Sequence, residues 1–305
     1  MNGTTANKNR KILTRNVKKN IFVAGMLLIP VVHFIIFWGV VNFNSILLAF
    51  QRLDPVTGKN FFTGVNFRSL VTSWQYGNLK PALTNTLLTF GLMIFMLPWG
   101  FFLTYFLYKK IHLSGFWRTM LFVPTILPAV ALTAIFMDII YPGGPIGHIW
   151  KAAGVQTPAF ITDGKYARWT ILIYILWTNF GGQFILFSGA MSRIPKEVIE
   201  SARLDGAGMR VEMLKIVLPL CWPTISMLLL LNVAGMFVAS GPILLFQGLH
   251  YSAITISYKI FNETLVGGQH LGEAAALGSV CTVILFPIVM LVRWLLGKVY
   301  ANVEF

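Results

Sequence analysis

The chain has 305 residues, of which 56% are hydrophobic and only 11% are charged. Its polar side chains are therefore too few to cover the surface of a water-soluble protein of this size. The net charge of +14 would suit nucleic acid, but the basic residues stand in short segments beside apolar runs, which argues against a nucleic-acid partner. The composition predicts an all-α, polytopic protein surrounded by membrane lipid.

Residues 1–20 form a basic segment with six Lys or Arg and no acid, and an apolar run from Ile21 to about Phe50 follows. This run is too long for the hydrophobic region of a signal peptide and lacks a small-residue cleavage site, so it predicts a retained transmembrane helix. Five more apolar runs are long enough to cross the bilayer, at residues 82–108, 116–140, 167–192, 220–247 and 273–297. We expect six spans in a single transmembrane domain, residues 21–305.

The orientation of these spans follows from the Lys and Arg residues in the connections. Sixteen of them lie in the set that holds both chain ends and residues 109–119 and 193–217, against eight in residues 51–81, 138–168 and 248–272. Because cytoplasmic connections carry the excess of positive charge, both termini and the segment 193–219 are predicted to be cytoplasmic.

The segment 193–219 is a charged island with nine ionisable side chains between two apolar runs. Burying it in the bilayer would cost on the order of 25 kcal/mol, so it lies outside. Pro195 suits the first turn of a helix, and the pair Asp205-Gly206 predicts the break that ends it. A second helix is expected from about residue 208 to 217, stopping before Pro219.

The order of residues in this island is specific. It reads Glu200-x-Ala202-x-x-Asp205-Gly206-Ala207, followed by Ile216-x-Leu218-Pro219. This pattern resembles the EAA loop of bacterial binding-protein-dependent ABC-importer permeases, with Ser201 at a position that is usually alanine. Glu273-Ala274-Ala275 spells the same letters but lacks Asp-Gly and Leu-Pro at the required offsets, so we reject it as such a loop.

Three further segments resemble the carbohydrate branch of these permeases, the maltose and glycerol-phosphate type: residues 116–128, 177–195 and 255–277. The resemblance covers roughly residues 20–300. The resemblance implies a type I importer permease with alternating access, in the bacterial cytoplasmic (inner) membrane. It implies as partners a second homologous permease, two ATP-binding subunits, an extracytoplasmic solute-binding protein and a carbohydrate substrate of the oligosaccharide class. The EAA loop would couple to an ATPase through Glu200 as charged anchor, Ala202 and Ala207 as small contacts, and Asp205-Gly206 as the bend.

No Gly-x-x-x-x-Gly-Lys-Ser/Thr loop occurs, so ATP and Mg are expected on the partner subunits and no cofactor or enzymatic activity on this chain. The scattered histidines and the two cysteines, Cys221 and Cys281, predict neither a metal site nor a disulfide framework. The alternative left open is a secondary transporter or channel driven by an ion gradient, which generic hydrophobicity and six spans would also fit.

A substrate path should appear as polar residues inside otherwise apolar helices. Two groups at helical spacing meet this description, and the resemblance also implies substrate contacts in these two helices: Asn179, Gly182 and Gln183 in the fourth span, and Asn232, Gly235, Met236 and Ala239 in the fifth. Packing between helices is the competing interpretation, above all for the small residues, and hydrogen bonding between helices competes for the amides.

Overall fold

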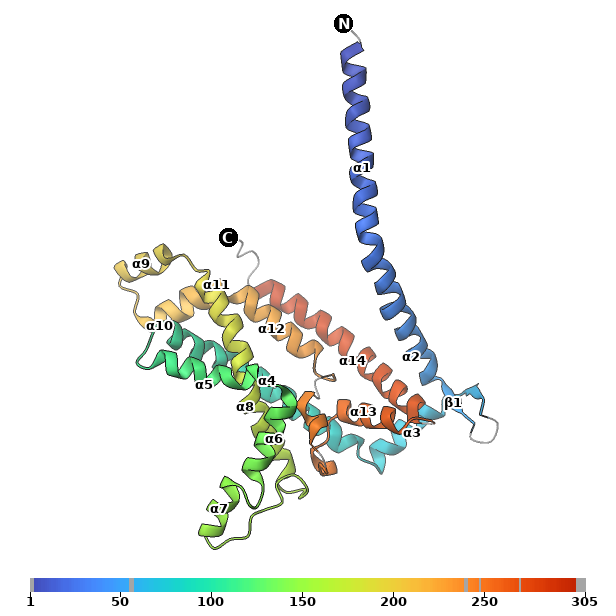
Figure 1. Cartoon of the computed structure of the whole chain (residues 1–305), viewed down its shortest axis with the longest axis vertical. Helices are drawn as coiled ribbons and strands as arrows, with labels where there is room; N and C mark the ends of the chain where they lie inside the picture. The colour runs from blue at the N-terminus through green and yellow to red at the C-terminus, as the bar shows by residue number, and fades with distance from the viewer. Residues whose placement is uncertain (1–2, 55–57, 239–240, 247, 269, 300–305) are drawn as a thin grey trace.

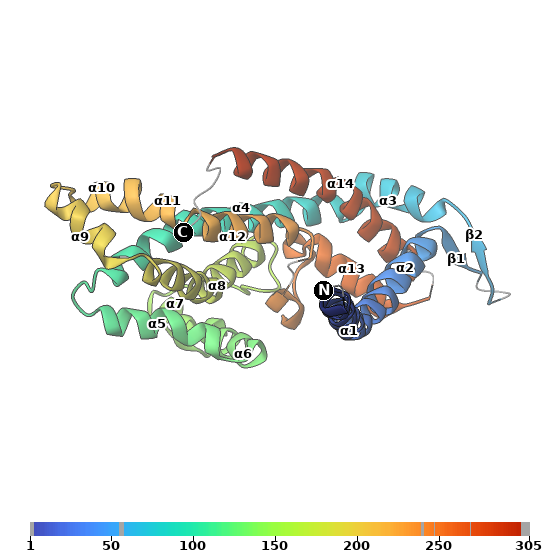
Figure 2. The ribbon, with the colours of Figure 1, turned by 90° about the horizontal axis from the view of Figure 1, so that it is seen from above.

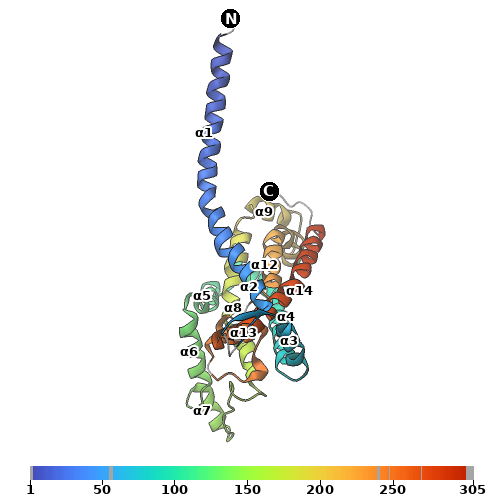
Figure 3. The same cartoon turned by 90° about the vertical axis from the view of Figure 1, so that its right-hand side faces the viewer.

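The computed structural model describes residues 3–54, 58–238, 241–246, 248–268 and 270–299. It is a helical bundle with one long helix, α1, standing apart from it (Figure 1). The segment around α9 and the hairpin of β1 and β2 lie at opposite ends of the bundle (Figure 2). α9 lies near its upper edge and α7 at the bottom in two perpendicular views (Figures 1 and 3).

The first expected span is part of one bent helix. α1 (Gly3–Phe34) passes through a π-helical turn (Ile35–Val40) into α2 (Val41–Ala49). Apolar side chains such as Ile29 and Phe37 are 75% and 63% exposed, which suits a helix surrounded by lipid or another membrane subunit. Only its α2 end packs closely on the bundle, against α14 (His270–Val299).

The connection after α2 contains the two strands, which the expectation of an all-helical chain did not include. β1 (Gln51–Leu53) pairs antiparallel with β2 (Asn60–Phe62), with Gln51 opposite Phe62. The helix α3 (Val65–Gln75) follows, and its fully buried Asn66 donates hydrogen bonds to the carbonyls of Ala49 (2.9 Å) and Gln51 (2.8 Å). A buried amide with two acceptors fixes this hairpin against α2 and α3.

The centre of the bundle is the pair α4 (Leu79–Tyr108) and α8 (Ala167–Ser192), which pack more extensively than any other two described elements. The expected third span, residues 116–140, is broken into α5 (Ser114–Ile126) and α6 (Ala129–Ile140). The reason is Pro128, which disfavours helical geometry in the preceding residue, and Leu127 is extended with ψ 141°. α7 (Pro145–Ala152) follows the Pro-Gly turn at 142–144.

The charged island gives α9 (Lys196–Leu204), α10 (Met209–Val211), a π-helical segment (Glu212–Val217) and α11 (Leu218–Leu220). The fifth span starts as α12 (Trp222–Ala234), followed by two 3₁₀ turns (Gly241–Leu245 and Tyr251–Ala253) and α13 (Ile256–Val266). Ala239 and residue 247, the end expected for that span, lie outside the described residues.

Within the described ranges, five helical stretches are long and apolar enough to cross a membrane. They are Val17–Ala49, Leu79–Tyr108, Ala129–Ala152, Ala167–Ser192 and His270–Val299, and a sixth results if Met209–Leu220 and Trp222–Ala234, bent by 66°, form one span. The multi-span, mainly helical class predicted from hydropathy is therefore confirmed, with the third and fifth spans bent or broken.

Candidate coupling loop and substrate path

The helix α9 has sharply defined ends. Pro195 occupies its N-cap position, and Asp205 is its C-cap residue. Gly206 follows with φ +83°, its N–H donating to the Arg203 carbonyl (3.0 Å), while the N–H of Ala207 donates to the Ala202 carbonyl (2.9 Å). These two bonds make a Schellman motif, in which a left-handed residue closes the end of a helix. The predicted break at Asp205-Gly206 is confirmed.

Ala202 and Ala207, the small residues of the charged island, help to close the end of α9. Ala202 and Ala207 are half-buried and joined by one of the closing hydrogen bonds. Ile199, on the inner face of α9, is 6% exposed and joins the apolar cluster formed by α4, α8, α12 and the π-helical segment. On the outer face Glu200 is exposed and Leu204 is 89% exposed. The outer face thus offers the Glu200 carboxylate and the large apolar side chain of Leu204 to a partner.

The second helix of the island does not stop before Pro219 as expected. Helical structure continues from Met209 to Leu220, and the bend of 66° falls at Cys221. A π-helical turn shifts the hydrogen-bond ladder just ahead of Pro219, and such turns and prolines are the usual places where a helix bends. The island therefore leads directly into the fifth span through a bend at Cys221.

Three of the candidate path residues are brought together. Asn232, Gly235 and Met236 of α12 and its C-terminal turn line a cavity of about 120 Å³. Its opposite wall comes mainly from α4 and from the start of α13, and consists of Thr86, Thr89, Phe90, Met93 and Thr255. The cavity therefore combines an amide and hydroxyl groups with an aromatic ring and methionines, the mixture expected of a site for a polar organic molecule.

The fourth-span candidates do not line this cavity. The Asn179 amide donates to the Ile175 carbonyl of its own helix (2.9 Å), and Gln183 is 9% exposed against Gly100 of α4. A Cβ at Gly182 would meet nothing within 4 Å, whereas one at Gly181 would lie 2.5 Å from the Leu121 carbonyl oxygen. The close approach to α5 thus falls at Gly181. A role of Asn179, Gly182 and Gln183 in substrate contact stays a prediction.

Two polar groups of α4 were missed in the sequence. Thr86 and Thr89 face the cavity at i and i+3, and the Thr86 hydroxyl also accepts a hydrogen bond from the Ile256 N–H (2.9 Å). These threonines could have been recognised in the sequence, because Asn85, Thr86 and Thr89 interrupt an otherwise apolar run. Glu212 was also passed over, although it is 2% exposed and contacts both α4 and α9.

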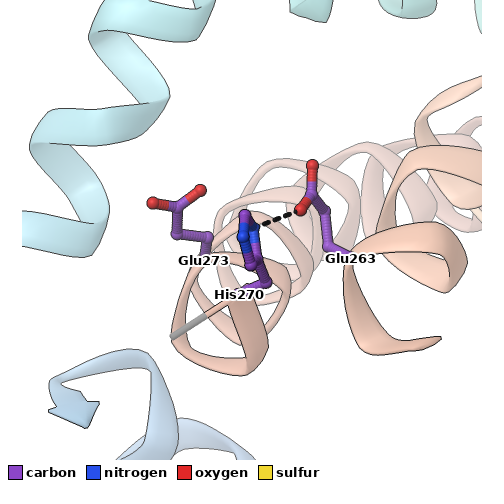
Figure 4. A group of neighbouring side chains, drawn as sticks. All are labelled: Glu263, His270 and Glu273. Carbon is purple, nitrogen blue, oxygen red and sulfur yellow. Dashed lines mark ion pairs between the residues drawn. The ribbon is translucent and has the colours of Figure 1, made fainter. Parts of the chain in front are cut away.

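The rejected motif at Glu273 lies at the start of α14, beside α13 and far from α9 (Figure 1). There Glu273 lies near His270 and Glu263, with potential ligand atoms within 4.8 Å of one another (Figure 4). The His270 Nδ1 is 2.7 Å from one Glu263 carboxylate oxygen, and the Lys259 ammonium lies 3.1 Å from the other. Lys259 and Glu263 belong to the same helix, so the contact of Glu263 with His270 is the one that joins α13 to α14.

Known proteins resemble this chain in sequence and in architecture. The family model described as binding-protein-dependent transport system inner membrane component matches residues 96–303. A sn-glycerol-3-phosphate transport system permease protein, UgpA, from Pectobacterium atrosepticum is 28% identical over 84% of this chain and 86% of its own length. The multiple sugar-binding transport system permease protein MsmF from Streptococcus mutans is 24% identical over 85% of this chain and 89% of its own.

A solved structure agrees at the level of the fold. A chain of a bacterial ABC transporter involved in the import of the acidic polysaccharide alginate matches with a TM-score of 0.78 and 23% identity, over 94% of this chain and 98% of that one. Since the family match spans well over half of the residues, the resemblance inferred from residues 193–219 is confirmed. The chain belongs to the inner membrane components of binding-protein-dependent transport systems and is a multi-pass ABC-importer permease subunit.

Proposed function

We propose that this chain is one of two permease subunits of a carbohydrate importer, which moves its substrate by alternating access while separate subunits hydrolyse ATP. The observation that carries the proposal is α9 with its Schellman end and exposed outer face at Glu200 and Leu204. A short helix joined rigidly to two spans can transmit a docking displacement as rigid-body motion.

A carbohydrate substrate is supported by the relatives and by the cavity between α4 and α12. UgpA and MsmF are named for the transport of glycerol phosphate and of multiple sugars. In this chain the cavity wall offers the Asn232 amide with the hydroxyls of Thr86 and Thr89. At about 120 Å³ the cavity holds part of a sugar at most, so substrate passage requires the helices to separate.

The partners follow from the same proposal. A matching structure is described in complex with an alginate pentasaccharide-bound periplasmic protein, and we expect an extracytoplasmic solute-binding protein here too. ATP and Mg would bind to two separate ATP-binding subunits, because the sequence contains no phosphate-binding Gly-x-x-x-x-Gly-Lys-Ser/Thr loop. The excess of Lys and Arg in these segments supports a cytoplasmic position for α9 and both chain ends.

Purification of the tagged chain from its native membrane tests the proposal. We expect a second permease and an ATP-binding subunit to co-purify, and sugar uptake by the reconstituted complex, with its binding protein, to require ATP. The ion-gradient alternative predicts the opposite result. Uptake by this chain alone, driven by an imposed proton or sodium gradient and unaffected by removal of ATP, would contradict the proposal.

A further inference from the structure

Glu212 is the one ionisable carboxylate among the described side chains that is buried. It is 2% exposed and lies at the start of the π-helical segment, six residues beyond the bend at Gly206. Apolar side chains that include Met213 and Phe101 form the core around this end of the bundle. A carboxylate in such surroundings is retained only when it is paired and hydrogen-bonded.

Its partners come from two other elements. The Lys109 ammonium at the end of α4 directly contacts one oxygen of Glu212, and the Tyr105 hydroxyl donates to the same oxygen (3.2 Å). Arg203 of α9 approaches the second oxygen with its Nε at 3.5 Å. Tyr105 also lies 3.2 Å from the Met209 carbonyl, so both of its acceptors belong to the same turn of the chain. Glu212 thus joins α4, α9 and the helix that leads into the fifth span.

The two ion pairs differ in strength. The Lys109 side chain is 14% exposed, whereas that of Arg203 is 56% exposed and its contact is long. Pairs open to water contribute little and exchange readily, whereas separating a buried pair leaves a desolvated charge without a partner. The contact between Glu212 and Lys109 is therefore the more costly of the two to separate.

The helix α4 carries two of the partners of Glu212 at its end and also part of the cavity wall. α4 is a single helix from Leu79 to Tyr108, with Tyr105 in its last turn and Lys109 as its C-cap residue. Roughly three and four turns before Tyr105, the same helix places Met93 and Thr89 in the cavity wall. A displacement of α9 that is carried through Glu212 to Lys109 therefore reaches the cavity wall without passing through a loop.

We propose that Glu212 is a positioning residue for transport: its buried pair with Lys109 is a permanent joint that transmits the movement of the α9 loop to α4. The inference rests on the proposed function, because the movement comes from the ATP-binding subunits. This inference goes beyond the proposed function because it assigns the transmission to a charge pair within this chain, not to the docking surface of α9.

The test uses the whole importer complex and a reporter cysteine in the cavity wall. Thr89→Cys is introduced after replacement of Cys221 and Cys281 by alanine, and its reaction with a small maleimide is timed with and without ATP. In this parent complex ATP should change the labelling rate. Glu212→Gln and Lys109→Gln should reduce that difference by about fivefold or more, the usual lower range of coupling between two sites. Lys110→Gln, which alters the neighbouring exposed lysine, should leave it unchanged.

Two further readouts distinguish loss of the Glu212–Lys109 contact from a folding defect and from weaker docking of the ATP-binding subunits. The ATP-binding subunits should remain bound in the Lys109→Gln complex, because the outer face of α9 is unaltered. Reversal of the pair, Glu212→Lys with Lys109→Glu, should restore most of the response, since the half-exposed Arg203 can turn into water. If Glu212→Gln fails to assemble, the Lys109→Gln and reversed-pair complexes decide the question.

If both single variants keep the full ATP-dependent change in labelling rate, the proposed role of the Glu212–Lys109 pair is wrong and the proposed function is unaffected. The same conclusion follows if the reversed pair assembles but shows no more response than the single variants. Absence of any ATP effect in the parent complex would instead contradict the proposed function, and the joint with it.

Discussion

Gly206 offers the sharpest test of how the coupling loop is built. Its φ of +83° is a left-handed conformation, and a Cβ there would meet nothing within 4 Å in this chain. The penalty for another residue is therefore backbone strain alone, about 1–2 kcal/mol for most side chains and more for a β-branched one. Asparagine tolerates this conformation far better, so Gly206→Asn is a matched control for Gly206→Val.

A strain of about 2 kcal/mol or more, as expected for valine, lowers the equilibrium constant for forming this loop conformation by roughly 30-fold or more. If that conformation is the one that binds the ATP-binding subunit, the apparent dissociation constant should rise by up to the same factor in Gly206→Val. Titration of the purified permease pair with that subunit measures it, and membrane abundance of the variant checks folding. Equal affinity of Gly206→Val and Gly206→Asn, at normal abundance, would refute this account of the loop.

Three other substitutions test the rest of the structure. Asn232→Leu should abolish most of the stimulation of ATP hydrolysis by the loaded binding protein, because it removes the amide from the cavity wall; unchanged stimulation would indicate packing. Gly181→Leu should lower the melting temperature of the complex through its clash with α5, whereas Gly182→Leu should not. Asn85→Leu should lower the free energy of unfolding by about 2–4 kcal/mol, since the buried carbonyl of Ile254 and the partly buried carbonyl of Ser252 lose their donor; an unchanged thermal transition would contradict this.

The regular parts of this fold could be predicted because the bilayer imposes length and polarity on each span. The fourth expected span, 167–192, coincides with α8, and the charged island gives the helix and bend read from Pro195 and Gly206. These features depend on local chemistry, namely hydropathy, capping and the conformational freedom of glycine.

Breaks within spans were harder to predict from the sequence. Pro128 separates α5 from α6 because it extends Leu127, whereas Pro124 and Pro219 lie inside continuous helical structure. Whether a proline breaks, bends or merely interrupts a helix depends on how neighbouring groups satisfy the freed carbonyl, and this is a property of tertiary packing.

The two sites could not be predicted from the sequence, because each is formed by contacts between segments that are far apart along the chain. Glu212 was indistinguishable in the sequence from the solvated charges around it, and Tyr105, its hydroxyl partner, lies 107 residues away. The cavity likewise pairs α12 with threonines of α4 that belong to a different span. Polar residues in apolar helices could be recognised one helix at a time, but not which of them would face one another.

Site-directed cross-linking at α9 tests most directly whether this chain is driven by a separate ATPase through its charged loop. Leu204→Cys, at a position 89% exposed on α9, should cross-link to an ATP-binding subunit in the native membrane. Leu265→Cys, 69% exposed on α13 toward the other end of the bundle, should not. Cross-linking that is absent at Leu204, or equal at the two positions, would contradict the account.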